Sequence, residues 1–196
     1  VDIPAQFSSV GLVLVFRAEV PQGVIEVRSR SFLALQRTAA MVLRAGPPAA
    51  ASAGDVLSGL VVRMLDGEGA QVVNSNTEVV VSLVPADGGD TRHDAVRGTV
   101  SVLSRGGEAT FSAVLLAQSG TFAMRFSAPF IGLSVDSALI VVSPGPFTGL
   151  DVEGEPADTV AGVPTSATVR LIDLYGNPTA ESGVQVALQV RAASDP

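Results

Sequence analysis

The stretch "VRLIDLYGNP", residues 169–178, joins an alternating apolar run to a cluster of turn-forming residues. Because side chains alternate across a β-strand, Val169 and Leu171 lie on one face, which we expect to be buried. Aspartate is favoured at the first position of a type I turn and glycine at the fourth, and Asp173 and Gly176 have this spacing. The stretch therefore predicts a strand that ends in a tight turn.

The remaining residues of this turn fit a structural role. The side chain of Asp173 can accept a hydrogen bond from the backbone two residues further on, and Gly176 relieves steric strain. Pro178 lacks an amide hydrogen, so we expect it to stop the strand from continuing. With Asn177 between them, these residues predict a structural turn and no chemical reaction.

The same pattern occurs earlier in the chain. "VVRMLDGEG" (61–69) aligns without a gap with "TVRLIDLYG" (168–176). Asp66 and Gly69 thus stand 107 residues before the aspartate and glycine of the second turn. A recurring block of this kind indicates an internal structural repeat.

Other matching blocks set the phase of the repeat. "GLVLVFRA" (11–18) resembles "TFAMRFSA" (121–128), and "SFLAL" (31–35) resembles "SALIV" (137–141). These blocks belong to the other half of the repeating unit. We therefore predict three regions: the C-terminal half of one module (1–38), a complete module (39–144) and the N-terminal half of a further module (145–196).

Alternation extends through most of the chain, in runs of about five to eight residues bounded by Gly, Pro, Asp or Asn. No segment has a sustained apolar stripe of helical period. The pattern predicts an all-β fold of antiparallel β-sandwiches. The residues expected to face the core are Leu60, Val62, Met64, Phe111, Ala113, Leu115, Phe122, Met124, Phe126, Ala167, Val169, Leu171, Val184, Val186, Leu188 and Val190.

The order of these motifs resembles that of the tandem Ig-like modules of bacterial invasins and intimins, and is also similar to that of filamin-type repeats. An "AG" pair precedes an alternating strand, then "D-x-x-G-N-P", then "V-x-V-x-L". The likeness covers essentially the whole chain, although "DGEGAQ" (66–71) lacks the Asn-Pro pair and the Cys and Trp landmarks of antibody domains are absent. The resemblance implies tandem Ig-like sandwiches that act as spacers, stalks or scaffold rods, without a fixed ligand.

Composition excludes several classes of function. A net charge of −7 argues against nucleic-acid binding, which requires a basic surface. Apolar runs such as 11–16 and 138–142 are far shorter than the roughly 20 residues that span a bilayer, so we expect no membrane insertion. The first residues show no signal-peptide pattern. The absence of cysteine rules out disulfides and thiolate metal sites.

The best candidates for chemistry lie in "DGGDTRHD" (87–94). His93 is the only histidine, and we expect it to be exposed in a loop rather than paired with a nucleophile. Asp87, Asp90 and Asp94 lack the alternation of a calcium loop, so a solvated hairpin is predicted, with a weak cation site as the alternative. We therefore expect no enzyme activity, cofactor or resident metal.

Two further features have alternative interpretations. The acidic stretch "DVEGEPAD" (151–158) is either an exposed strand edge or a calcium-binding linker. Tyr175, the only tyrosine, either shields the end of its own sandwich or docks onto a neighbouring module or partner.

The sequence as a whole predicts a non-enzymatic structural protein of a cell surface or appendage, outside the cell. Its expected partners are neighbouring Ig-like modules, of the same chain or of adjacent copies in an assembly. The alternatives are an intracellular filamin-like scaffold, cytoskeletal or ciliary, and a ligand-binding adhesin module.

Overall fold

The computed structural model describes residues 11–33, 36–154, 158 and 160–191; the parts of the expected modules at 1–10, 155–157 and 192–196 lie outside it. Nearly all regular structure in the described part is β-strand, which confirms the all-β prediction. The strands are β1 (Gly11–Leu12), β2 (Val15–Val20), β3 (Gly23–Arg28), β4 (Phe32–Leu33), β5 (Ala40–Ala45), β6 (Ala50–Ser52), β7 (Val56–Leu57), β8 (Leu60–Leu65), β9 (Glu78–Pro85), β10 (Val96–Gly98), β11 (Ser101–Leu103), β12 (Glu108–Phe111), β13 (Val114–Leu116), β14 (Gly120–Ala128), β15 (Leu133–Ser143), β16 (Phe147–Glu153) and β17 (Thr168–Asp173).

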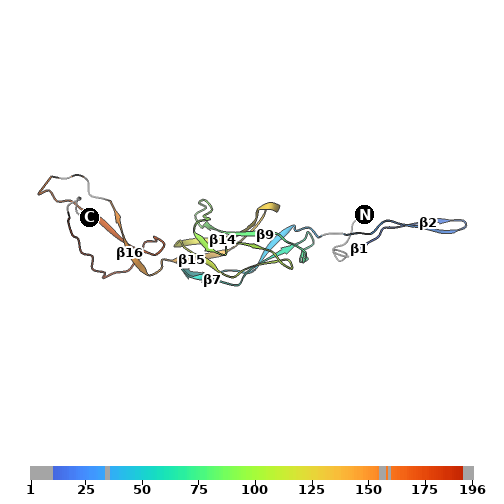
Figure 1. The fold of residues 1–196 in the computed structure, drawn as a ribbon, viewed down its shortest axis with the longest axis horizontal. Helices are drawn as coiled ribbons and strands as arrows, with labels where there is room; N and C mark the ends of the chain where they lie inside the picture. The colour runs from blue at the N-terminus through green and yellow to red at the C-terminus, as the bar shows by residue number, and fades with distance from the viewer. Residues whose placement is uncertain (1–10, 34–35, 155–157, 159, 192–196) are drawn as a thin grey trace.

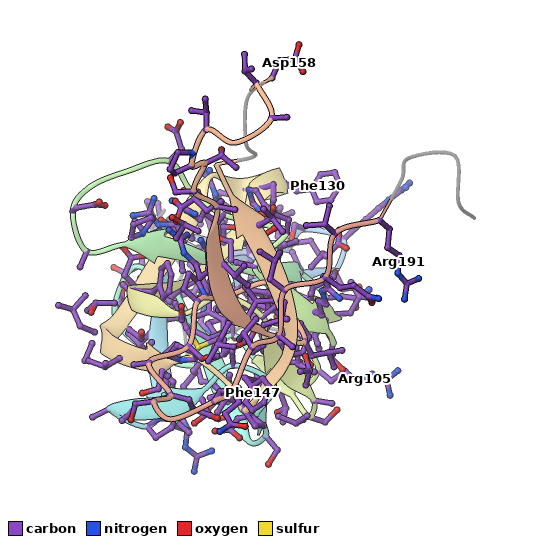
Figure 2. All side chains as sticks on the ribbon, turned by 90° about the vertical axis from the view of Figure 1, so that its left-hand side faces the viewer. Arg105, Phe130, Phe147, Asp158 and Arg191 are labelled. Atoms are coloured by element: carbon purple, nitrogen blue, oxygen red, sulfur yellow. The ribbon has the colours of Figure 1, made fainter. Side chains whose placement is uncertain are left out.

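The strands form an elongated chain with three parts (Figure 1). The N-terminal hairpin (residues 11–33) projects from one end of the central body (residues 40–143). The C-terminal segment (the described residues of 144–191) lies at the other end. One short 3-10 helix, η2 (Pro129–Ile131), connects β14 to β15. Its residue Phe130 is 84% exposed and stands at the surface in the view along the long axis (Figure 2).

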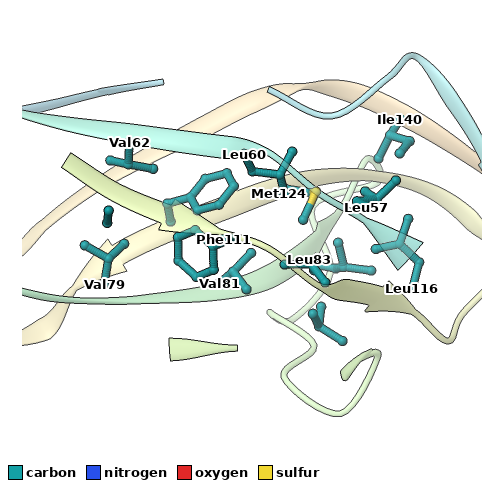
Figure 3. Close-up of a cluster of buried hydrophobic side chains, with 14 of the residues drawn as sticks. Leu57, Leu60, Val62, Val79, Val81, Leu83, Phe111, Leu116, Met124 and Ile140 are labelled. Atoms are coloured by element: carbon teal, nitrogen blue, oxygen red, sulfur yellow. The ribbon is translucent and has the colours of Figure 1, made fainter. Parts of the chain in front are cut away.

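The central body contains three sheets, with strand orders β11-β9-β14-β15-β6, β12-β8-β5 and β10-β13-β7. All neighbours are antiparallel except β15 and β6, which are parallel. Buried side chains from the three sheets pack into one cluster (Figure 3). Within it the rings of Phe111 and Phe126 lie 5.4 Å apart at 60° to one another, a geometry that aromatic pairs favour.

The predicted alternation is confirmed in the middle of this body. Leu60, Val62 and Met64 on β8 are buried, as are the three predicted residues of β14, Phe122, Met124 and Phe126. Burial of this kind contributes roughly 1.5–3 kcal/mol for each large apolar side chain. The two strands therefore supply much of the free energy that holds the central body together.

The prediction for residues 109–116 was wrong after Phe111. Val114 and Leu116 are buried, whereas Ala113 and Leu115, which we expected in the core, are only half-buried. The chain bends at Ser112, where it leaves β12 in the sheet of β8 and enters β13 in the sheet of β10 and β7. This crossing shifts the buried face by one residue, which a single alternating pattern cannot anticipate.

The N-terminal hairpin has the same construction as the β14–β15 hairpin. Strands β1 and β2 pair with β4 and β3 in one long antiparallel ladder with an interruption at its middle. At that interruption Leu14 N donates to Ser29 Oγ at 2.9 Å. In the central body Met124 N donates to Ser137 Oγ at 2.9 Å, beside the register shift between β14 and β15. The two hairpins therefore share one backbone-to-serine hydrogen bond at corresponding places.

The C-terminal segment departs from the sequence expectation in two places. β16 and β17 form a two-stranded sheet in which Val169 is exposed and Leu171 half-buried, and Ala167, just before β17, is exposed. Residues 183–190, expected as a strand, are described but pair with no other described strand, and Leu188 is 88% exposed. A strand face becomes buried only where a second layer covers it, and no described sheet covers the exposed faces of β17 and of residues 183–190.

Candidate functional site: a polar clamp at the C-terminal join

Both aspartate turns close with the same hydrogen bond. Gly69 N donates to the carbonyl oxygen of Asp66 at 3.2 Å, and Gly176 N donates to that of Asp173 at 3.1 Å. The two glycines have φ values of +83° and +84°, in the left-handed region that side chains disfavour. Glycine is therefore required at the fourth position of each turn.

The carboxylate of Asp173 accepts four hydrogen bonds although it is only 3% exposed. Its Oδ1 accepts from the backbone N–H groups of Tyr175 (2.8 Å) and Asn177 (2.9 Å). Its Oδ2 accepts from Gly145 N (2.9 Å) and Asn177 Nδ2 (2.8 Å). Burial raises the pKa of Asp173, but the hydrogen bonds from Asn177, Gly145 and Tyr175 outweigh it and hold the pKa below its ordinary value.

Asp66 makes the equivalent contacts in the first turn. Its Oδ1 accepts from the backbone N–H groups of Glu68 (3.0 Å) and Ala70 (2.9 Å). Its Oδ2 accepts from Gln36 Nε2 at 3.3 Å. In each turn, one carboxylate oxygen bonds to the turn backbone and the other accepts from a residue shortly before a strand, from Gln36 before β5 or from Gly145 before β16.

Asn177 connects the second turn to the central body. Its side-chain nitrogen donates to Ala117 O at 3.0 Å, and its side-chain oxygen accepts from Ser119 N at 2.9 Å. Ala117 and Ser119 lie in the loop between β13 and β14, some 60 residues earlier in the chain. Asn177 is 6% exposed, so these bonds are sheltered from water. The asparagine, expected only as a turn residue, is a clamp between two parts of the fold.

Strand β17 ends at Asp173, and Pro178 lies after the turn. The chain folds back after the turn, and Pro178 faces Ile172 in an antiparallel bridge. The flanking bonds run from Asp173 N to Asn177 O and from Thr179 N to Leu171 O, both at 2.9 Å. The bridge therefore needs no N–H from residue 178, which is why proline is tolerated there.

Gly145 is held in close contact at the same join. A Cβ atom at this position would lie 2.8 Å from the carbonyl oxygen of Ala53 and 3.5 Å from Asp173 Oδ2. Any side chain would have to displace the backbone of the central body. The close approach brings Gly145 N within reach of the aspartate.

Tyr175 docks onto the central body rather than shielding the end of its own β16–β17 sheet. Its ring packs against the buried cluster, and a Cβ on Gly54 would lie 3.2 Å from the ring. The guanidinium carbon of Arg97 is 5.5 Å from the ring centre, within the range of a cation–π contact. Together with Asn177 and Asp173, Tyr175 forms what we call the clamp.

The first turn lacks these two side chains. Ala70 stands at the position of Asn177 and Glu68 at that of Tyr175, 107 residues earlier. Alanine has no amide to bridge to another loop, and Glu68 is exposed. The two joins therefore share the aspartate contact but differ at these clamping positions.

The other candidate sites stay separate in the structure. His93 is exposed, and so are Asp87, Asp90 and Asp94. Asp87 Oδ1 accepts from Gly89 N at 3.1 Å, so this carboxylate closes its own loop. Among the described residues, no three His, Asp or Glu side chains form a group that could hold a metal ion. Residues 155–157 of the acidic stretch 151–158 lie outside the described residues.

Sequence reasoning missed the long-range partners of the clamp, Ala117 and Ser119 above all. They contribute backbone atoms, which carry no side-chain signal. No family model matches the chain, and no curated protein matches it. In the part of the chain that the structure describes, no helix is long and apolar enough to cross a membrane.

Proposed function

We propose that this protein is a non-enzymatic structural protein, a segment of a tandem Ig-like array that serves as a spacer, stalk or filament component of a cell-surface or appendage structure. The observation that carries the proposal is a pair of aspartate turns with matching hydrogen bonds. Two turns 107 residues apart each use one carboxylate oxygen for the turn and the other for the preceding chain. Units that contact only their neighbours add length with each copy.

The distribution of buried residues supports module boundaries near residues 39 and 144. Every buried apolar side chain of the described part lies between Met41 and Val142. In this proposal the central body is the complete Ig-like sandwich, the N-terminal hairpin ends the module before it, and β16 and β17 begin the module after it. The partners are therefore other Ig-like modules, of this chain or of adjacent copies.

The clamp supports a role in transmitting mechanical force along the chain. A turn that is bonded to a second unit through sheltered hydrogen bonds, as Asn177 is to the backbone of Ala117 and Ser119, holds that unit at a fixed angle. Each of these bonds contributes about 0.5–1.5 kcal/mol, because neither partner is ionised. A spacer needs a fixed angle between its units, because a chain of freely jointed units would not hold its two ends apart.

Single-molecule extension tests the proposal. Pulling on the two ends should unfold the central body in one cooperative step, because its roughly 100 residues share one buried cluster. The released chain should lengthen by about 300–350 Å, at roughly 3.3–3.6 Å per residue.

A disulfide provides the matched control. Ser82 and Arg125 are paired across β9 and β14, so a disulfide between S82C and R125C should shorten the step by about 150 Å. Gradual extension without a step, or a step that this disulfide does not shorten, would contradict a central body that unfolds as one unit under force.

A further inference from the structure

The five-stranded sheet of the central body has an apolar patch on its outer face. Leu139 and Val141 on β15 are 54% and 52% exposed. On the neighbouring strand β14, Ala123 lies opposite Leu139 and Thr121 lies opposite Val141. We call these four residues the apolar face. The solvent face of an antiparallel sheet is commonly polar, so large apolar side chains at successive outward positions mark a surface that another molecule can cover.

The facing sheet of the same body has a different outer face. On the sheet β12-β8-β5, Arg63 and Arg44 both donate to Glu108 Oε1 at 2.9 Å. A charged cluster of this kind is typical of a sheet face in contact with water. The apolar face is therefore a property of the five-stranded sheet and not of both sides of the body.

An ion pair stands next to the apolar face. Arg125 on β14 lies opposite Asp136 on β15. The Nε atom of Arg125 donates to Asp136 Oδ1 at 2.8 Å, and Nη2 donates to Asp136 Oδ2 at 2.7 Å. The two side chains are 38% and 39% exposed. Each carboxylate oxygen can accept a further hydrogen bond, so the pair can take part in a second set of charged contacts.

No described part of the chain covers the apolar face. The N-terminal hairpin and the C-terminal segment lie at the two ends of the central body, along its long axis (Figure 1). In the proposed array further modules are added at those same ends, which leaves the sides of each module open. The inference that follows rests on that proposed function.

A two-fold axis that runs parallel to the strands, between β14 and β15, makes the apolar face complementary to itself. This rotation brings β15 of one copy over β14 of the other at the same height along the strands. Leu139 then lies over Ala123 of the second copy, and Val141 lies over Thr121. A large side chain meets a small one at each position, as close packing between two sheets requires.

The ion pair selects the parallel orientation. The same rotation brings Arg125 of each copy over Asp136 of the other. An axis perpendicular to the strands at this point would instead set arginine against arginine and aspartate against aspartate, which like-charge repulsion disfavours. We propose that the apolar face packs against the same face of a second copy of this chain, with the strands of the two copies parallel. A contact of this kind uses the same surface on both partners and closes as a pair.

The size of the shared surface fits a weak contact for one module. Four strands, β9, β14, β15 and β6, overlap their counterparts across this axis. With about 4.8 Å between strands and about 3.4 Å per residue along the 9 residues of β14, each copy contributes on the order of 600 Å². The total of about 1,200 Å² stands at the lower end of the range for stable interfaces.

An array strengthens the contact. The strands run along the long axis of the molecule, so successive modules of two parallel arrays meet side by side (Figure 1). Each contact after the first forms within one complex, which raises the overall affinity above that of a single module. The N-terminal hairpin has a corresponding charge arrangement, with Arg17 on its first long strand donating to Glu26 on its second at 2.8 Å. The proposal therefore predicts arrays that pair side by side.

Single-cysteine chains test the orientation, because the natural chain has no cysteine. Val141 and Ser134 are exposed positions near the two ends of β15. In the parallel pair each lies close to its own counterpart across the axis. A short bismaleimide should therefore crosslink V141C to V141C and S134C to S134C. An equimolar mixture, with one chain carrying a size tag, should give at least tenfold less V141C–S134C dimer than either homodimer.

T110C is the control for crosslinking through random encounter. Thr110 is exposed on β12, in the facing sheet of the central body. Because this strand lies on the far side from the apolar face, T110C should give at least tenfold less crosslinked dimer than V141C under the same conditions.

Charge variants test the contact between copies. Arg125→Glu and Asp136→Arg each break the ion pair within their own chain, so each variant alone should associate at least tenfold more weakly than the natural chain in sedimentation. An equimolar mixture of the two should restore the association to within about threefold. In the mixed pair the introduced glutamate faces the introduced arginine of the other chain, although the ion pairs within each chain stay broken. Amide exchange in β9 and β14 should stay slow in both variants, which shows that the sheet remains folded.

Several outcomes would overturn the pairing. These are a V141C–S134C dimer as abundant as the homodimers, equal dimer yields from T110C and V141C, a mixture of charge variants that associates no better than each variant alone, or a natural chain that stays monomeric at high concentration. The extension experiment on single molecules does not depend on association, so it separates failure of this pairing from failure of the proposed function.

Discussion

Replacing Phe111 by alanine is expected to lower the free energy of unfolding of the central body by about 4 kcal/mol. The side chain is fully buried and its ring packs at 5.4 Å from that of Phe126, between strands of facing sheets. Removing it deletes a large apolar surface and leaves a cavity that the surrounding strands fill only in part. Chemical denaturation of the chain, followed by amide hydrogen exchange in β8, β9 and β14, measures the loss.

A second phenylalanine gives the matched control for this substitution. Phe130 in η2 is 84% exposed, so Phe130→Ala should change the same free energy by less than about 0.5 kcal/mol. Exchange in β2, β3, β16 and β17 should be unchanged in both variants, because these strands contribute no residue to the buried cluster. Equal losses in the two variants would show that the central body does not depend on this core.

Replacing Asp173 by alanine is expected to destabilise the clamp by about 3 kcal/mol, the second-largest effect. Four donors lose their acceptor at once, and the three from Gly145 and Asn177 lie where water has little access. An unsatisfied buried donor costs about 1–3 kcal/mol, and partial hydration offsets some of the sum. Amide exchange at Gly145, Tyr175 and Asn177 should therefore accelerate by roughly two orders of magnitude.

Two variants control for the clamp. Asp66→Ala removes three acceptor contacts, one of them at 3.3 Å, so its effect should be smaller and confined to the first turn. Asp173→Asn retains one oxygen and should restore part of the protection. Unaltered exchange at Gly145 in Asp173→Ala would contradict the role of the second carboxylate oxygen in holding the join.

The sequence predicts the buried residues well where one face of a strand packs against a facing sheet. Burial alternates along β8 and β14, and the residues expected to face inward, Leu60, Val62, Met64, Phe122, Met124 and Phe126, all lie in the core. The prediction fails where the chain changes sheets, as between β12 and β13, because alternation records only which face is buried and not where the sheet ends. It fails again at residues 183–190, where the pattern indicates a face but no described partner covers it.

The clamp illustrates a different limit. Asp173 and Gly176 were recognisable from their spacing, because a tight turn is a local structure. The bonds from Asn177 reach backbone atoms about 60 residues away, and the bond from Gly145 N reaches an aspartate 28 residues later in the chain. Such contacts depend on how two units pack, so an asparagine before a proline reads only as a turn residue. The alanine at position 70 is the one available signal, since it shows that the asparagine is not required by the turn itself.

The distance between the central body and the C-terminal segment tests the central claim most directly. Spin labels on T110C in β12 and D151C in β16, both exposed positions, report that distance by pulsed electron resonance. We predict a single narrow distance distribution for the otherwise natural chain, because the clamp fixes the angle of the join. Adding Asn177→Ala, which removes the bonds to Ala117 and Ser119, should broaden the distribution at least twofold. A broad distribution before that substitution, or an unchanged narrow one after it, would contradict a rigid spacer held by this clamp.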